Sequence, residues 1–181
     1  MSKPFIFISG NQHKVDYLRK WLDMPVEHQA VDLDELQSLS LKSVVEHKVK
    51  QAYDIVKKPV LVEDVGFTFE ALGRLPGPLI KWFLEELGTD GLTRLASGLD
   101  HQKAHVSIMY AWYDGMHMHF FENHVSGTVA PEPRGTNGFG WNAVFIPEGS
   151  DKTYAEMTDD EVRPFSVRAQ AIDQLKAFLQ E

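Results

Sequence analysis

Cysteine is absent from the 181-residue sequence, and so are internal repeats and long apolar runs. Without cysteine, neither a disulfide framework nor a thiolate metal site can form. No apolar run reaches the roughly 18 residues at which a membrane span would be expected. The N-terminal residues also lack the parts of a signal peptide. We therefore expect a cytoplasmic protein with no membrane partner.

Positive charge is in deficit as well, because the formal net charge is −8. An acidic protein binds nucleic-acid backbones poorly, so we expect no nucleic-acid partner. A small polyanion can still bind where a few basic residues converge and a divalent cation assists them. The length suits one domain covering residues 1–181, and the 43% hydrophobic content is normal for a globular protein.

The order of apolar segments predicts an α/β fold, with a twisted, mixed central sheet flanked by helices. Strands are expected at 4–9, 26–31, 59–62 and 144–146. Helices are expected at 12–22, 41–56, 79–87, 91–99 and 166–179. Two strand-like runs, 105–113 and 117–129, meet at Asp114-Gly115, which is a strong hairpin signal.

A candidate anion site lies where the first strand leads into the first helix. Its residues are Ser9-Gly10-Asn11-Gln12-His13-Lys14. Helix N-termini offer unpaired N–H groups and the positive end of a dipole, and Lys14 adds a charge. The segment lacks the Walker A spacing, so an ordinary capped strand-to-helix turn is the alternative.

Acidic residues form a second candidate site. Glu63 and Asp64 directly follow the strand expected at 59–62, and Glu35 lies in an acidic loop. Ligands of open α/β sheets bind beyond the carboxyl ends of strands, and carboxylates there suit Mg²⁺. The alternatives are a helix-capping role for Asp64 and a solvated loop around Glu35.

Two later segments could contact a flat base. The loop 135–142 places three glycines around Phe139 and Trp141, which indicates a stacking platform or, equally, aromatic side chains that pack into the core. Arg168 begins the last helix, where it could bind a base edge or a phosphate, or lie at the surface beside a capping serine.

Histidines offer a further alternative, a zinc site on the expected hairpin. His117 and His119 would share a strand face. No other residue has convincing ligand spacing, so exposed hairpin histidines are the simpler interpretation.

Five segments of the chain occur in an order that closely resembles the inosine triphosphate pyrophosphatase family. They are SGNQHK at 9–14, LVEDVGFTFEALGRLPGPLIKWF at 61–83, GTNGFGWNAVFIP at 135–147, TYAEM at 153–157 and SVRAQA at 166–171. The resemblance implies an elongated α/β fold whose two lobes enclose an active-site cleft. It also implies a homodimer and Mg²⁺-dependent hydrolysis of ITP, dITP or XTP to the monophosphate and pyrophosphate, with Mn²⁺ able to replace Mg²⁺.

The resemblance also implies residue roles. Asp64 matches the residue that activates water and, with Glu35, a Mg²⁺ ligand. The remaining matches contact substrate: the phosphate loop 9–14, the lysines Lys48 and Lys81, the base platform Phe139, Gly140 and Trp141 with the neighbouring Asn142, and the base-reading Arg168.

Four positions depart from the family pattern. Val65 replaces a Thr or Ser, Asn142 an Asp, Val162 a Lys and Val167 a His, and Arg163 could stand in for the lost lysine. Three of these four lie where the base is read, so we expect altered or relaxed base preference. The rival hypothesis is a nucleotide-binding or sensing protein with impaired catalysis.

Overall fold

The computed structural model describes residues 3–181. Its strands are β1 (Ile6–Ile8), β2 (Glu27–Gln29), β3 (Val60–Phe69), β4 (Pro76–Gly77), β5 (Lys103–Tyr113), β6 (Met118–Val129) and β7 (Phe145–Pro147). Its α-helices are α1 (Gln12–Leu22), α2 (Leu41–Val56), α3 (Ile80–Ser97), α4 (Asp159–Val162) and α5 (Val167–Gln180). Short 3-10 helices span Glu70–Leu72, Gly140–Ala143, Tyr154–Glu156 and Arg163–Phe165.

The described strands form one seven-stranded mixed sheet in the order β2-β1-β3-β5-β6-β7, with β4 also paired to β3. β1 is parallel to β2 and to β3, with Ile6 opposite Val60. The pairs β3–β4 and β6–β7 are antiparallel. The prediction of a mixed sheet flanked by helices is therefore confirmed.

The chain divides into two compact units. Unit 1 comprises the described part of residues 1–64 together with Ile108–Asn123 and Arg168–Glu181. Unit 2 comprises Val65–Ser107 and His124–Val167. β3, β5 and β6 each contribute residues to both units. The single domain expected over 1–181 and the cleft implied by the family resemblance stay predictions.

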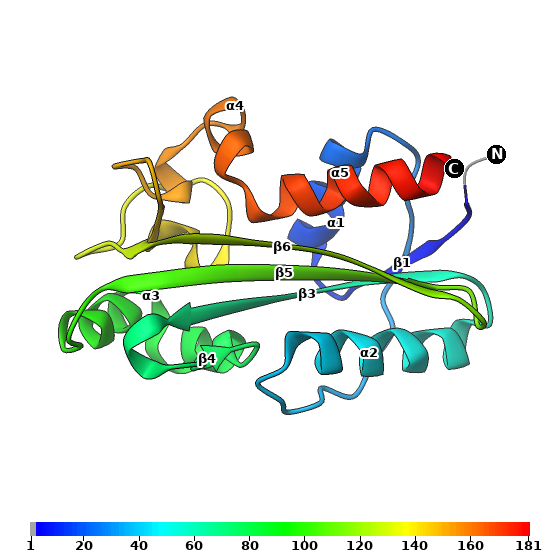
Figure 1. Ribbon diagram of the computed structural model, residues 1–181, viewed down its shortest axis with the longest axis horizontal. Coiled ribbons are helices and arrows are strands. Elements are labelled where there is room, and N and C mark those ends of the chain that lie inside the picture. The colour runs from blue at the N-terminus through cyan, green and yellow to red at the C-terminus, as the bar shows by residue number, and fades with distance from the viewer. Residues whose placement is uncertain (1–2) are drawn as a thin grey trace. The chain divides into compact units, whose positions relative to one another are not determined.

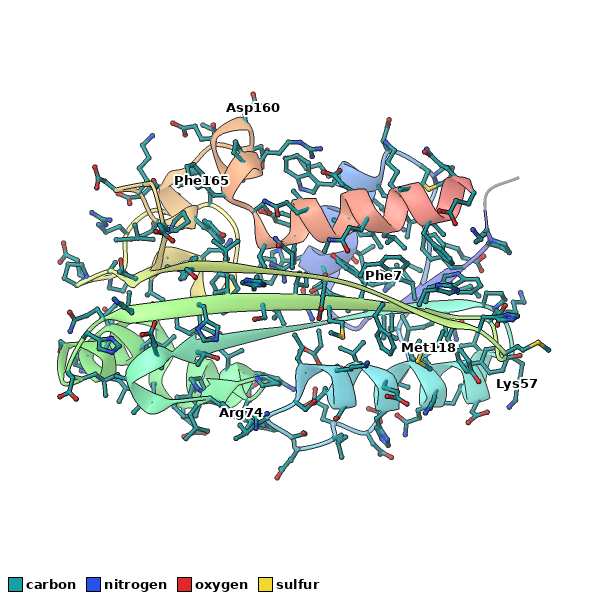
Figure 2. The ribbon with its side chains drawn as sticks, in the orientation of Figure 1. Phe7, Lys57, Arg74, Met118, Asp160 and Phe165 are labelled. Carbon is teal, nitrogen blue, oxygen red and sulfur yellow. The ribbon has the colours of Figure 1, made fainter. Side chains whose placement is uncertain are left out.

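Unit 1 buries both faces of its strands. Successive strand residues point to opposite faces, so even and odd positions of β1 and β3 meet different helices. Ile6, Ile8, Val60 and Val62 pack with residues of α2 in one hydrophobic cluster. Figure 1 shows α2 along this face of the unit and α1 and α5 along the other. The fully buried Phe7 lies inside the unit in Figure 2, whereas Lys57 lies at its periphery.

Side-chain caps explain why α1 and α2 begin where the sequence predicted. Asn11 Oδ1 accepts hydrogen bonds from the backbone N–H groups of His13 and Lys14 at 3.0 and 3.4 Å. Ser40 Oγ accepts one from Ser43 N–H at 3.2 Å. Such caps satisfy N–H groups that the helix itself leaves unpaired. On α2, Val44, Val45, Val49 and Ala52 are buried, and Val56 is partly buried.

One strand prediction was wrong in a way that matters for the site. β3 continues to Phe69, so Glu63 and Asp64 lie within the strand and not after it. The continuation is paired with β4, where Phe67 faces Gly77. Because β1 ends at Ile8, the two acidic residues still lie beyond the carboxyl end of that parallel neighbour.

The hairpin and the helices of the middle of the chain agree with the sequence. β5 and β6 are neighbours joined through a turn in which Asp114 Oδ1 accepts hydrogen bonds from Met116 N–H and His117 N–H. The two helices expected at 79–87 and 91–99 both lie within α3. The non-helical backbone of Gly88 separates them as a kink. Among residues 3–181, no helix is long and apolar enough to cross a membrane.

Candidate functional site

Asp64 points toward α2 and forms an ion pair there. Lys48 Nζ lies 2.7 Å from Asp64 Oδ2, and both side chains are 17% exposed. Lys48 is carried by α2, which covers the same face of the strands as the buried Val60 and Val62. An ionic hydrogen bond of this length fixes the orientation of the carboxylate. The structure thus brings together two residues to which the resemblance gave substrate and metal roles.

Glu63, the preceding residue, points to the opposite face and is fully buried. Its Oε1 accepts a hydrogen bond from the Arg168 guanidinium at 3.1 Å, and its Oε2 accepts one from the Tyr110 hydroxyl at 2.8 Å. Lys14 Nζ is 3.4 Å from Glu63 Oε1 and donates to the Glu63 carbonyl oxygen at 3.4 Å. A buried carboxylate with this set of partners is well compensated for the loss of water.

The partners of Glu63 decide its ionisation. Burial alone would raise the pKa of Glu63, but the charges of Arg168 and Lys14 and the hydrogen bonds from Arg168 and Tyr110 lower it to about 2. Burial and the neighbouring carboxylate raise the pKa of Tyr110 well above its usual value. Burial would lower the pKa of Arg168, yet the Glu63 charge raises it. Glu63 is therefore an anion at neutral pH, while Arg168 is a cation.

The segment expected to bind phosphate has the geometry of a capped helix start. Ser9 Oγ accepts a hydrogen bond from Asn11 N–H at 3.1 Å, and Gln12 Nε2 donates to Asp16 Oδ1 at 2.7 Å. His13 is exposed, and a Cβ added to Gly10 would meet no atom within 4 Å. The backbone at Gly10 therefore has open space where a side chain would stand.

Glu35 lies in an exposed loop that is anchored to α2. The neighbouring Asp34 exchanges two hydrogen bonds with Gln51, both of 2.8 Å, and Leu33 packs against the core of unit 1. Residues 3–181 contain no group of three or more His, Asp or Glu side chains arranged for a metal. Mg²⁺ commonly takes only one or two carboxylates and completes its shell with water and substrate phosphates, so the carboxylate chemistry of Asp64 and Glu35 suits it. The Mg²⁺ site itself stays a prediction.

Arg168 is buried, although a surface position was one of the two interpretations of the sequence. It is only 4% exposed, and its guanidinium carbon lies 5.6 Å from the centre of the Tyr17 ring of α1. Arginine stacked on an aromatic face gains a cation–π attraction in addition to its ionic hydrogen bond. The surface interpretation is therefore wrong, because Glu63 compensates the buried charge.

In unit 2, the loop predicted to hold the base contains one aromatic residue that is part of the core. Trp141 is 4% exposed, and its ring packs against Phe67, Phe145 and Tyr154 at centroid distances of 5.6, 5.9 and 6.0 Å. Phe139 is half-buried and Gly140 is exposed. Trp141 thus packs into the core, as one of the two interpretations of this loop predicted. The base platform stays a prediction.

The positions that depart from the family pattern are mostly buried. Asn142, Val162 and Val167 are 6%, 5% and 1% exposed, whereas Val65 is half-buried. Arg163 is exposed, as a stand-in for a lysine would need to be. Lys81 is also exposed, with its Nζ 5.1 Å from the centre of the Trp82 ring.

The unit 2 loop depends on a glycine that touches neighbouring backbone. Gly135 has a φ of +82°, and a Cβ there would lie 2.2 Å from the carbonyl carbon and oxygen of Ala155. That oxygen accepts hydrogen bonds from Thr136 N–H and Asn137 N–H, both of 3.0 Å. The loop backbone is therefore held directly against Ala155.

We expect Gly135→Ala to lower the free energy of unfolding by more than the roughly 1–2 kcal/mol of a left-handed alanine alone, because backbone atoms block the methyl group. Gly149→Ala is the matched control, since its φ is +86° and its nearest side-chain atom would be 3.6 Å away. Urea unfolding of both variants measures the difference. Equal losses would contradict the close contact.

The sequence marks Glu63 as an acid but does not indicate that it orients other side chains, and it indicates no role for Tyr110 or Tyr17. A glutamate directly after a run of three apolar residues was the available signal, because a buried acid requires partners. The identity of those partners was hidden, since Lys14, Tyr110 and Arg168 lie 49, 47 and 105 positions away in sequence.

Comparison with known proteins assigns the chain to a family. Residues 5–178 match the Ham1 family. The chain is 42% identical to an inosine triphosphate pyrophosphatase of Schizosaccharomyces pombe, over 98% of this chain and 96% of the relative. It is 35% identical to a dITP/XTP pyrophosphatase of Thermococcus kodakarensis, over 97% and 96% of the two chains.

Solved structures support the same fold. A HAM1 protein from Coxiella burnetii superposes with a TM-score of 0.83 at 22% identity, covering 98% of this chain and 99% of that one. The Ham1 protein of Staphylococcus aureus gives a TM-score of 0.76 at 23% identity, with 98% of each chain covered. The resemblance read from the sequence motifs is confirmed, and the chain belongs to the Ham1 family.

Proposed function

We propose that this protein hydrolyses nucleoside triphosphates to the monophosphate and pyrophosphate, with Mg²⁺ as cofactor. The observation that carries the proposal is a pair of lysine–carboxylate contacts on consecutive residues of one strand. Lys14 meets Glu63 on one face of β3, and Lys48 meets Asp64 on the other. These carboxylates lie within β3 but beyond the carboxyl end of the parallel strand β1, where cations beside carboxylates suit a polyphosphate bound together with a divalent metal.

Within this proposal, Asp64 orients a water molecule and accepts its proton as the water oxygen attacks the α-phosphorus. The bond to the bridging oxygen breaks, and pyrophosphate leaves. Lys48 keeps the Asp64 carboxylate in place at 2.7 Å, and its charge stabilises the anionic phosphates. Lys14 and the N-terminus of α1 bind further phosphate oxygens. Mg²⁺ held by Asp64 and Glu35 would polarise the phosphate and neutralise part of its charge.

The base preference of this protein is proposed to be altered or relaxed relative to its ITP-hydrolysing relatives. Val162 and Val167 are buried apolar side chains, so neither can donate a hydrogen bond to a base. A site discriminates strongly only against analogues that leave its polar groups unpaired. Arg168 remains as a cation near Tyr17 and keeps some capacity to recognise a purine.

A substrate panel with pyrophosphate detection tests the proposal. ITP, XTP, dITP, GTP, ATP and UTP are compared in Mg²⁺, in Mn²⁺ and with a chelator. We expect pyrophosphate release that the chelator abolishes, with a smaller preference for ITP and XTP than in the relatives. Nucleotide binding in calorimetry without turnover in either metal would instead support the binding or sensing hypothesis. A strong ITP and XTP preference would overturn the relaxed specificity alone.

Two expectations lie outside this site. A cytoplasmic location and a homodimer both stay predictions, and sedimentation of the purified chain would test the second.

A further inference from the structure

Glu63 interacts with two cations to which the proposed function gives different tasks. Lys14 is assigned to the phosphates and Arg168 to the base, yet one buried carboxylate oxygen, Oε1, contacts both of them. The two contacts differ in quality. The Arg168 hydrogen bond is 3.1 Å long and buried, whereas Lys14 stands 3.4 Å away with its side chain 15% exposed.

The short contacts of Glu63 form a rigid support for Arg168. Tyr110 donates to the second carboxylate oxygen at 2.8 Å, which fixes the rotation of the carboxylate. The centre of the Tyr17 ring lies 5.6 Å from the guanidinium carbon of Arg168. A guanidinium held by a buried ionic hydrogen bond and placed over an aromatic ring has little freedom to turn. The orientation of the guanidinium is therefore defined.

The long contact to Lys14 has a different effect. At 3.4 Å the ammonium is too distant for a good hydrogen bond, so a phosphate can attract it without breaking a strong interaction. The carboxylate nevertheless neutralises part of the positive charge around Lys14. With Glu63 ionised, the group Glu63, Lys14 and Arg168 carries a net charge of +1, from two cations and one anion. Without that carboxylate charge the net charge would be +2.

We propose that Glu63 is a positioning residue that links the two ends of the substrate site. It holds Arg168 in the orientation that discriminates between bases, and it limits the attraction of Lys14 for phosphate so that pyrophosphate does not bind too tightly. This inference rests on the proposed function for the roles of Lys14 and Arg168. Glu63 itself touches neither the base nor the reacting phosphorus in this assignment.

The isosteric variant Glu63→Gln should weaken the discrimination between bases and strengthen the binding of pyrophosphate. The spread of kcat/KM between the best and the worst nucleotide of the panel should narrow by about tenfold, the value of one ionic hydrogen bond. Pyrophosphate, measured as a competitive inhibitor and by calorimetry, should bind at least about threefold more tightly, because a nearby negative charge is lost. General damage to the fold does not tighten binding, so this gain separates positioning from a merely structural role.

Two further variants separate the effect on base discrimination from the effect on pyrophosphate affinity. Glu63→Asp keeps the charge but withdraws the carboxylate, so it should narrow the spread and leave pyrophosphate affinity unchanged. It also decides the matter if Glu63→Gln does not fold. Tyr17→Leu removes only the ring beside Arg168 and should narrow the spread by about threefold. Glu161→Gln is the control, since it removes a carboxylate from an exposed pair with Lys152 and should change neither quantity.

An unchanged spread in Glu63→Gln or, if that variant does not fold, in Glu63→Asp overturns the assignment. An unchanged or weaker affinity for pyrophosphate in Glu63→Gln overturns it as well. Failure of the proposed function is recognised separately, because the wild-type protein would then release no pyrophosphate. In that case the same spread is measured as nucleotide dissociation constants by calorimetry.

Discussion

Asp64→Asn is expected to reduce turnover by about 10²–10⁴-fold while nucleotide affinity stays within a few-fold of the wild type. Asparagine has the shape of aspartate and can still accept the hydrogen bond that Lys48 donates at 2.7 Å. It cannot accept a proton from water, and it is a weaker metal ligand. The loss should therefore be in kcat, with the local structure preserved.

The measurement is single-turnover pyrophosphate release alongside calorimetry with the same nucleotide. Glu46→Gln is the matched control, because it removes a carboxylate that also pairs with a lysine of α2, Lys50, but at the surface. Its rate should equal that of the wild type. Turnover by Asp64→Asn within tenfold of the wild type would remove Asp64 from the catalytic role.

The elements around this site were predictable where local chemistry determines them. α1 and α2 have the predicted bounds because Asn11 and Ser40 cap them and because apolar residues recur at helical spacing. The break within α3 falls at Gly88, whose φ of +63° is easily adopted only by glycine. Each of these signals is contained in a short stretch of sequence.

The length of β3 was not predictable in the same way. Two adjacent acids normally end a buried strand, because ionised side chains are costly to bury alone. In this chain the cost of burying each carboxylate is offset on its own face of β3. Lys48 pairs with Asp64 on one face. Arg168 and Tyr110 donate hydrogen bonds to Glu63 on the other. These partners come from distant segments, so the continuation of the strand depends on tertiary contacts.

Burial also decides between the alternatives that the sequence left open for the surroundings of two site residues. An arginine at a helix start and a tryptophan at the end of a glycine-rich loop both resemble exposed residues in a sequence. Arg168 is buried because a carboxylate on β3 neutralises it, and Trp141 is buried because Phe67, Phe145 and Tyr154 surround it. Neither environment can be read from neighbouring residues.

Glu63→Gln is expected to lower the free energy of unfolding at neutral pH by about 3–5 kcal/mol, because it leaves buried cations without their anion. The pKa of the carboxyl gives a similar value. A fall from 4.5 to about 2 corresponds to about 3 kcal/mol of stabilisation of the folded state. This is a large part of the total stability of a typical domain, roughly 5–15 kcal/mol.

The same contribution should depend on pH in a defined direction. Because the pKa of Glu63 is lower in the folded state, the folded chain binds fewer protons than the unfolded chain between about pH 4.5 and pH 2. The stabilisation is complete above pH 4.5 and is lost as the pH falls toward 2. Arg168 remains charged throughout this range, because the Glu63 charge raises its pKa. Glu63→Gln should therefore differ most from the wild type near pH 6 and progressively less below pH 4.5.

Glu161→Gln tests whether the loss of stability comes from burial of the carboxylate or from its lowered pKa alone. The hydrogen bond from Lys152 lowers the pKa of Glu161 to about 2 as well, but this carboxylate lies at the surface, where water screens its contacts. Urea unfolding at pH 3 to 7, in the presence of a chelator, compares the two variants without a metal contribution. A difference between Glu63→Gln and the wild type that is constant with pH would show that packing, and not the buried charge, accounts for the loss. A pH-dependent loss in Glu161→Gln as large as in Glu63→Gln would show that burial is not the deciding factor.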